Sequence, residues 1–130
     1  REKEDPLTLI EPVISREEVL EMTEHVKNIY VDDKLYHYIT MLAEETRKHE
    51  YVKLGVSPRG AIALCSMAKA GACVKGRDYV VPEDISRVFK DVCRHRLILH
   101  PKAALSDMDA DGILDEILEK TSAPKLDPGA

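Results

Sequence analysis

The chain has 130 residues, of which 44% are hydrophobic and 33% are charged, and its formal net charge is −5. These values exclude a disordered chain and predict one globular domain with a single core. The acidic balance argues against a dedicated nucleic-acid-binding protein, and no apolar run is long enough to span a membrane. The three cysteines and the histidines lack metal-ligand spacing, so we expect reduced thiols, no metal site and a cytoplasmic protein.

The chain begins at Arg1 without Met, from which we expect a fragment of a longer protein. Residues 1–14 are charged and then extended, because Pro6 and Pro12 block a helix, and we interpret them as a linker from another domain. Ser15 and Glu18 form a capping-box pattern, which predicts the start of a first helix. The apolar face of this helix carries Val19, Met22 and Val26.

A second helix is expected from about Lys34 to His49, capped by Asp32 or Asp33. Its apolar residues keep helical spacing and are Leu35, Tyr38, Ile39 and Leu42.

The run from Gly55 to Ala61 opens the most alanine-rich helix, which is expected from Pro58 to Val74. Ser57 can accept from the N–H groups of the first turn, and Pro58 suits the first position because it has no N–H to lose. Arg59 then lies at the positive end of the helix dipole, where it is either a solvated side chain or a ligand for a phosphate. One face carries small side chains that let another helix approach closely: Ala61, Leu64, Cys65, Ala68 and Ala72.

Pro82, Glu83 and Asp84 predict the start of a fourth helix. We expect the β-prone residues 97–99 to pair with residues 29–31, and residues 101–110 to form a loop. A last helix is expected from about Asp111 to Lys120, followed by a flexible tail at residues 122–130. The fold class is therefore mainly α, a small bundle of about five helices with a short two-stranded β pair.

Residues 107–112 have the acids and the glycine of half an EF-hand loop. The twelfth position, where calcium needs a bidentate Glu, is Leu118, so we favour an acidic loop in which Asp109 or Asp111 caps the last helix. The basic run Arg94-His95-Arg96 suits the negative end of the preceding helix. The chain contains no complete catalytic apparatus and no phosphate-binding loop.

The order of several spaced motifs resembles the C-terminal lid of MoxR-type AAA+ ATPases. The resemblance covers roughly residues 5–121 and rests on Val31-Asp32-Asp33-Lys34, Tyr38-Ile39, Thr46-Arg47, Gly55-Val56-Ser57-Pro58-Arg59, Gly76-Arg77-Asp78-Tyr79-Val80, Pro82-Glu83-Asp84-Ile85 and Val92-Cys93-Arg94-His95-Arg96. It implies a linker at residues 1–14 from a missing nucleotide-binding core, a helical lid at residues 15–121 and a tail at residues 122–130.

The resemblance also implies a function. Arg59 would be the sensor 2 arginine, which contacts the phosphates of ATP bound in the core, with Ser57 and Pro58 beside it. Gly60 departs from the alanine expected there and would loosen the first turn. The parent would be a chaperone-like ATPase that forms a homo-oligomeric ring, usually a hexamer, and that works with von Willebrand factor A-domain proteins. The core would hold the Walker motifs and Mg²⁺, so the fragment alone should be inactive and bind no cofactor.

A second hypothesis is a histone-fold-like module that binds proteins or DNA. The alanine-rich helix followed by residues 76–85 also matches the passage from the central helix to the last helix of such folds. The net charge of −5 weighs against DNA. A third hypothesis, a calcium-sensing domain, depends on the acidic loop at residues 107–112.

Overall fold

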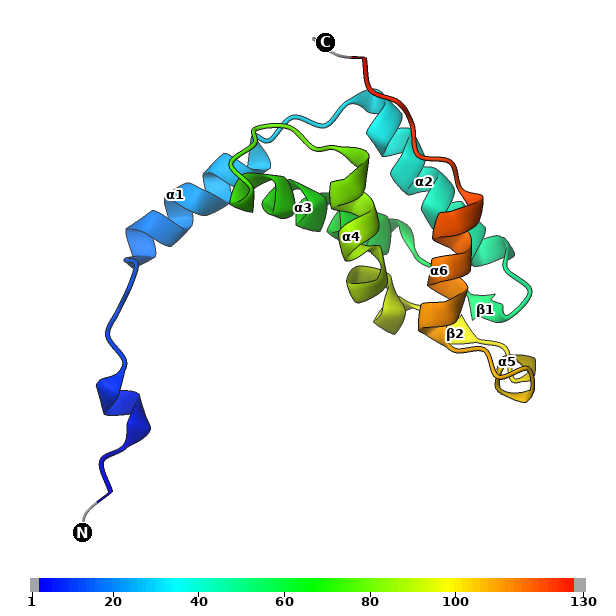
Figure 1. The fold of residues 1–130 in the computed structure, drawn as a ribbon, viewed down its shortest axis with the longest axis horizontal. Coiled ribbons are helices and arrows are strands. Elements are labelled where there is room, and N and C mark those ends of the chain that lie inside the picture. Colours follow the sequence, from blue (N-terminus) through cyan, green and yellow to red (C-terminus); the bar gives the residue numbers. More distant parts are fainter. Residues whose placement is uncertain (1–2, 128–130) are drawn as a thin grey trace.

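Four helices form the body of the molecule in the computed structural model, which describes residues 3–127. They are α2 (Asp33–Lys48), α3 (Pro58–Val74), α4 (Pro82–Cys93) and α6 (Ala110–Lys120). Helix α3 packs on α2 and α4, while α6 covers the other side of the same pair (Figure 1). With α1 (Arg16–Lys27) and the one-turn α5 (Lys102–Leu105), the described chain has six α-helices, so the prediction of a mainly α bundle is confirmed.

Side-chain caps begin these helices where the sequence predicts them. Ser15 and Glu18 form the expected capping box of α1, with both hydrogen bonds at 3.1 Å. Asp32, rather than Asp33, caps α2 by accepting the Lys34 N–H at 2.9 Å. At the end of α3, Gly76 adopts a φ of 77°, a left-handed conformation that glycine takes without steric cost.

The core lies between α2, α3, α4 and α6. Its largest fully buried apolar side chains are Phe89, Leu35, Leu42, Leu64, Ile85, Ile113 and Leu114. The face that α3 buries is narrow and consists of Gly60, Leu64, Ala68 and Ala72. Ala61 and Cys65 of the predicted face are only partly buried against the core. Small side chains let α4 lie close to α3, and each large apolar side chain buried beside them stabilises the fold by about 1.5–3 kcal/mol.

The predicted β pair exists, but its predicted partner is wrong. Residues 98–99 form β2 (Ile98–Leu99), which pairs in antiparallel fashion with β1 (Val52–Leu54) and not with residues 29–31. Tyr30 instead forms an isolated parallel bridge with Tyr79. β-propensity marks a run as able to pair, whereas the positions at which α2 and α4 end decide which runs meet.

The structure adds detail to the C-terminal part of the chain. The predicted loop at residues 101–110 contains α5, which is too short to leave a periodic signal in the sequence. Residues 122–127 of the predicted tail contain no helix or strand, although Leu126 packs against the core, and residues 128–130 lie outside the described part.

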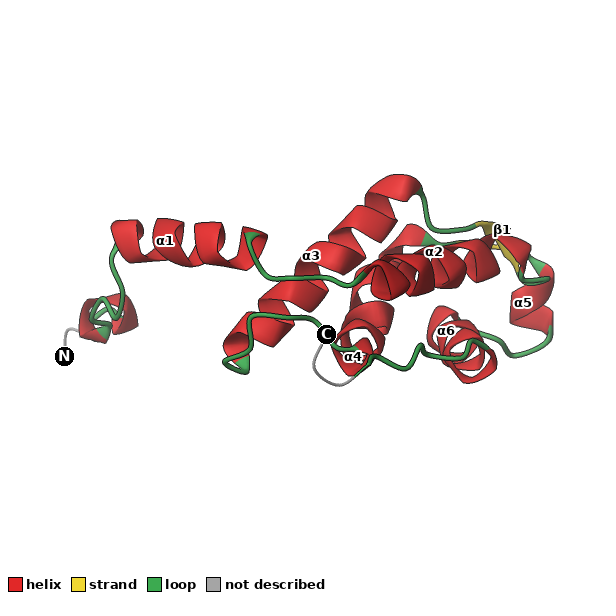
Figure 2. Cartoon of the chain, turned by 90° about the horizontal axis from the view of Figure 1, so that it is seen from above, coloured by secondary structure: helices red, strands yellow, loops and turns green. Residues whose placement is uncertain are grey.

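Helix α1 lies outside the body and buries none of its residues in this chain. Its predicted apolar face stays largely exposed, with Val19 at 44% and Met22 at 55%. Figure 2 shows α1 and a short 3-10 helix (Pro6–Leu9) extending away from the bundle, opposite the end that carries β1 and α5. Within residues 3–127, no helix has the length and apolar character needed to cross a membrane.

Candidate functional site

The first turn of α3 has the capped geometry that its sequence predicts. Ser57 Oγ accepts the Gly60 N–H at 3.3 Å, and Pro58 occupies the first helical position. The Ala61 N–H donates to the Ser57 carbonyl at 3.1 Å. Of this turn, only the N–H of Arg59 has no partner among the described residues.

Arg59 is exposed, and its guanidinium has no ion pair or hydrogen bond within residues 3–127. An exposed side chain at this position fits both interpretations of Arg59, a solvated residue and a ligand for a phosphate. A free guanidinium and a free N–H at the positive end of a helix form a donor set that suits a phosphate oxygen.

A hollow of about 370 Å³ lies beside this turn. Its lining consists of Arg47, Leu54, Gly55, Val56, Ser57 and Arg96. Two guanidinium groups in this lining add positive charge next to the Ser57 cap, while Arg59 stands outside the lining.

The structure shows why glycine occupies position 60, which the sequence alone does not reveal. A Cβ at this position would lie 2.6 Å from Val56 Cγ1 and 3.1 Å from Arg96 Cδ. The expectation that glycine merely loosens the first turn is therefore incomplete, because α3 begins too close to these two side chains to accept alanine without a shift.

The basic run at residues 94–96 divides into separate roles. Arg94 donates to Asp111 from Nε at 2.6 Å and from Nη2 at 3.2 Å, which ties the end of α4 to the start of α6. The hydrogen bonds from Arg94 lower the pKa of Asp111. His95 and Arg96 remain exposed, so Arg94 serves the fold and only its neighbours stay available to a partner.

The acidic loop provides the cap of α6. Asp109 Oδ1 accepts the Gly112 N–H at 2.8 Å and so caps α6, one of the two caps predicted. Asp111 is engaged by Arg94. In the described part of the chain, no group of three or more His, Cys, Asp or Glu side chains could hold a metal ion.

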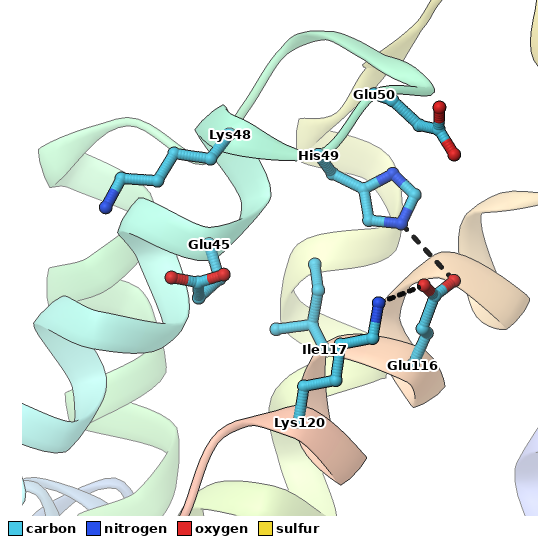
Figure 3. Close-up of a pocket in the computed structure, with 7 residues that line it drawn as sticks. All are labelled: Glu45, Lys48, His49, Glu50, Glu116, Ile117 and Lys120. Atoms are coloured by element: carbon cyan, nitrogen blue, oxygen red, sulfur yellow. Dashed lines mark hydrogen bonds and ion pairs between the residues drawn. The ribbon is translucent and has the colours of Figure 1, made fainter.

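His49 is the one histidine in a charged hollow between α2 and α6 (Figure 3). Its Nε2 lies 3.3 Å from Glu116 Oε2, and its Nδ1 accepts the Tyr51 N–H at 3.2 Å. Lys120 donates to the other oxygen of Glu116 at 2.6 Å, and the hydrogen bonds from Lys120 and His49 lower the pKa of Glu116. His49, Glu116 and Lys120 therefore bind one another across this hollow.

The cysteines are free thiols, as predicted. Cys93 is fully buried, and this burial raises its pKa to about 11 despite the opposing charge of Arg96. Such a thiol is inert at neutral pH and serves as a small core side chain.

The residues that link α3 to α4 form an ion pair that reasoning from local motifs missed. Asp84 is 2% exposed, and its two oxygens accept from Arg77 at 2.7 Å each. The Val81 N–H also donates to Asp84, at 2.8 Å. Burial acts to raise the pKa of Asp84, but the hydrogen bonds from Arg77 and Val81 and the charge of Arg77 outweigh it and lower the pKa. The available signal was an arginine directly after Gly76, seven residues before the acid of the Pro82-Glu83-Asp84 helix start.

Comparison with known proteins identifies the fold. The family model described as the AAA lid domain matches residues 44–117, more than half of the chain. The chain belongs to the AAA lid domain family.

Relatives of this lid extend the likeness beyond the matched residues. A Bacillus subtilis protein named YeaC, of uncharacterised function, is 40% identical over 124 residues, which are 95% of this chain and 39% of YeaC. Chaperone MoxR1 of Mycobacterium tuberculosis is 30% identical over 123 residues, 88% of this chain and 33% of the relative. The lid thus spans between a third and two fifths of the length of these relatives.

A solved structure agrees with the fold. The crystal structure of a protein assigned as an ATPase from Cytophaga hutchinsonii has a TM-score of 0.81 and 33% identity, over 86% of this chain and 37% of that one. The prediction of a MoxR-type AAA+ lid is confirmed, and these comparisons support it over the histone-like alternative.

Proposed function

We propose that this lid works in a MoxR-type ATPase, where Arg59 contacts the phosphates of ATP bound in a separate nucleotide-binding core. The observation that carries the proposal is the unpaired Arg59 in the capped first turn of α3. Arginine without a carboxylate partner, set beside a free N–H, is suited to an anion that comes from outside this chain.

The surroundings of Arg59 fit a phosphate. Ser57 and Pro58 begin α3, so the positive end of its dipole faces the same direction as the Arg59 N–H. Arg47 and Arg96 line the adjoining hollow and add to the positive potential. The carboxylates of Asp84 and Asp111 are already engaged by arginines, so in this proposal Mg²⁺ takes its protein ligands from the core.

Contact with ATP at Arg59 would couple the nucleotide to the position of the whole lid. Helix α3 is joined to α4 by the Arg77–Asp84 pair, and α4 is joined to α6 by Arg94 and Asp111. A pull on the first turn of α3 would therefore move a connected body rather than a single loop. Release of the phosphate after hydrolysis would remove that pull.

The family and the name of the mycobacterial relative extend the proposal to the parent protein. We propose a cytoplasmic homo-oligomeric ring, a hexamer, that acts as a chaperone in the assembly or maturation of protein complexes. Proteins with von Willebrand factor A domains are the proposed partners. Residues 1–14 are proposed as the link to the core, residues 15–121 as the lid proper, and residues 122–130 as a flexible tail.

The test is Arg59→Ala in the full-length protein. Removal of a donor to the charge that develops on a transferred phosphate should lower ATP turnover by about 100-fold. Steady-state hydrolysis measures the rate, and circular dichroism checks that the helical content is unchanged. Arg87→Ala is the matched control, because Arg87 is an exposed arginine on α4, away from the first turn of α3.

Turnover in Arg59→Ala equal to that of Arg87→Ala would contradict the role of Arg59. Loss of turnover with loss of helical content would indicate a folding defect, and Arg59→Lys then separates the two explanations. Lysine keeps the charge and the helix propensity but lacks the planar fork, so a folded Arg59→Lys protein with reduced turnover supports the contact.

A further inference from the structure

The segment that leads into α3 is held by α2. Residues 55–57 have no regular secondary structure, yet both backbone groups of Val56 are engaged. The Val56 N–H donates to Thr46 Oγ1 at 2.9 Å, and the Val56 carbonyl accepts from Arg47 Nε at 3.0 Å. Both partners lie in the last turn of α2, so α2, rather than β1, determines where α3 begins.

Thr46 is suited to this task because its hydroxyl both donates and accepts a hydrogen bond. The side chain is completely buried, and its Oγ1 donates to the Ala43 carbonyl at 2.6 Å while it accepts from Val56. Because the side chain is buried, one donated and one accepted hydrogen bond give the hydroxyl a single orientation. Val56, itself 1% exposed, therefore has a defined position.

A close backbone contact with α2 also holds this segment. A Cβ on Gly55 would lie 2.7 Å from the Arg47 backbone nitrogen and 2.8 Å from its Cα. Two main chains meet here without a side chain between them. The hydrogen bonds and this contact together leave the start of α3 little freedom to move relative to α2.

We infer that Arg47, together with Thr46, is a positioning residue for Arg59. Arg59 lies three residues after Val56, separated only by the cap Ser57 and the rigid Pro58, so its direction follows the position of Val56. The inference rests on the proposed function of Arg59 and adds α2 to the elements that determine the position of Arg59. A displacement of about 1 Å at a reacting group can lower a rate by about 100-fold, so a small shift of Val56 matters.

Arg47 could alternatively contribute only positive charge near the phosphate, and conservative variants separate the two roles. Arg47→Lys keeps the charge but lacks the Nε donor that Val56 uses. Thr46→Ser keeps the hydroxyl, whereas Thr46→Val keeps the shape and removes it. Positioning predicts that Arg47→Lys and Thr46→Val are impaired and that Thr46→Ser is close to wild type.

A double-mutant cycle in the full-length protein tests the inference. ATP turnover is measured for wild type, Arg47→Lys, Arg59→Ala and the double variant. If Arg47 acts through Arg59, Arg47→Lys lowers kcat/KM by roughly tenfold in the wild-type background and leaves the Arg59→Ala background unchanged. Thr46→Val, measured in the wild-type and Arg59→Ala backgrounds, should behave in the same way. Circular dichroism checks that each variant is folded.

The outcomes distinguish this inference from the proposed function. If Arg59→Ala turns over ATP like wild type, the proposed function is wrong and the positioning role falls with it. If Arg59→Ala is impaired but Arg47→Lys lowers kcat/KM by the same factor in both backgrounds, Arg59 keeps its role and Arg47 is merely structural. Wild-type turnover in Arg47→Lys would also overturn the positioning role.

Discussion

Close packing requires glycine at positions 55 and 60 of this lid, but not at position 71. The Cβ that an alanine would add at Gly55 meets the backbone of Arg47, whereas a Cβ at Gly71 meets nothing within 4 Å. Both are glycines in the sequence, and only the structure separates their roles. The difference yields opposite predictions for the same chemical change.

Gly55→Ala should destabilise the lid by roughly 1–3 kcal/mol, because main-chain atoms cannot move aside as a flexible side chain can. Gly71→Ala, within α3, should stabilise it by up to about 1 kcal/mol, since alanine is the better helix former. Urea unfolding of the two variants measures both free energies. Equal effects of the two changes would contradict the packing at Gly55.

Residue roles were predictable from the sequence where they depend on local hydrogen bonds. Ser15, Ser57 and Asp109 each cap the helix that follows them, because an N-cap reaches only to its own first turn. The bond from Arg47 to Val56 and the contact at Gly60 join residues whose distance depends on the packing of several helices. A sequence pattern cannot report such distances, even when the residues belong to a recognised motif.

At the scale of elements, the Arg77–Asp84 pair holds the junction of α3 and α4. The carboxylate has a side chain with no exposed surface and accepts three hydrogen bonds. Because folding lowers the pKa of Asp84 below its usual value near 3.8, its stabilising effect is present above that pH. The effect is lost as the pH falls through the lower value of the folded state.

Asp84→Asn should therefore destabilise the lid by about 3 kcal/mol at pH 7, since it leaves Arg77 half-buried beside a neutral group. It should also weaken the acid dependence of stability below about pH 4. Urea unfolding at several pH values measures both effects. Asp115→Asn is the control, because Asp115 is 53% exposed in its pair with Lys90 and should change the stability little. A loss at Asp84 no larger than the loss at Asp115 would contradict the assigned role.

The helices themselves were largely predictable, and the strand pairing was not. Apolar spacing and caps lie within one element, so α2, α3, α4 and α6 begin within one residue of their expected starts. The pairing of β1 with β2 depends on where α2 and α4 end in space, because each strand follows one of these helices. Tyr30 shows the difference, since its β-prone run does pair, but with Tyr79 in the α3–α4 link.

At the scale of the whole molecule, the lid divides into a packed body and a projecting arm. The body contains α2, α3, α4 and α6, and every one of these helices buries side chains in the shared core. Helix α1 has the apolar spacing of a buried helix but buries no residue in this chain. Periodicity predicted the helix and its apolar face, yet the sequence could not show what lies against that face.

Hydrogen exchange should separate the arm from the body. Helices α1 and α6 make a matched pair, with 12 and 11 residues, but only α6 buries side chains, namely Ile113, Leu114 and Ile117. Helix α1 contacts α3 but buries no residue, and a short helix with so little tertiary packing is marginal in water, so its amides open by local fraying rather than by global unfolding. We expect protection in α1 to be lower than in α6 by a factor of about 100 or more.

Mass spectrometry of exchanged peptides from the two helices measures this ratio at a dilute and at a high protein concentration. Equal protection at both concentrations would contradict the division into body and arm. Protection of α1 that rises with concentration, while α6 stays constant, would show that a second molecule covers Val19 and Met22. The concentration dependence of amide protection in α1 therefore measures how far the stability of this helix depends on contacts with another molecule.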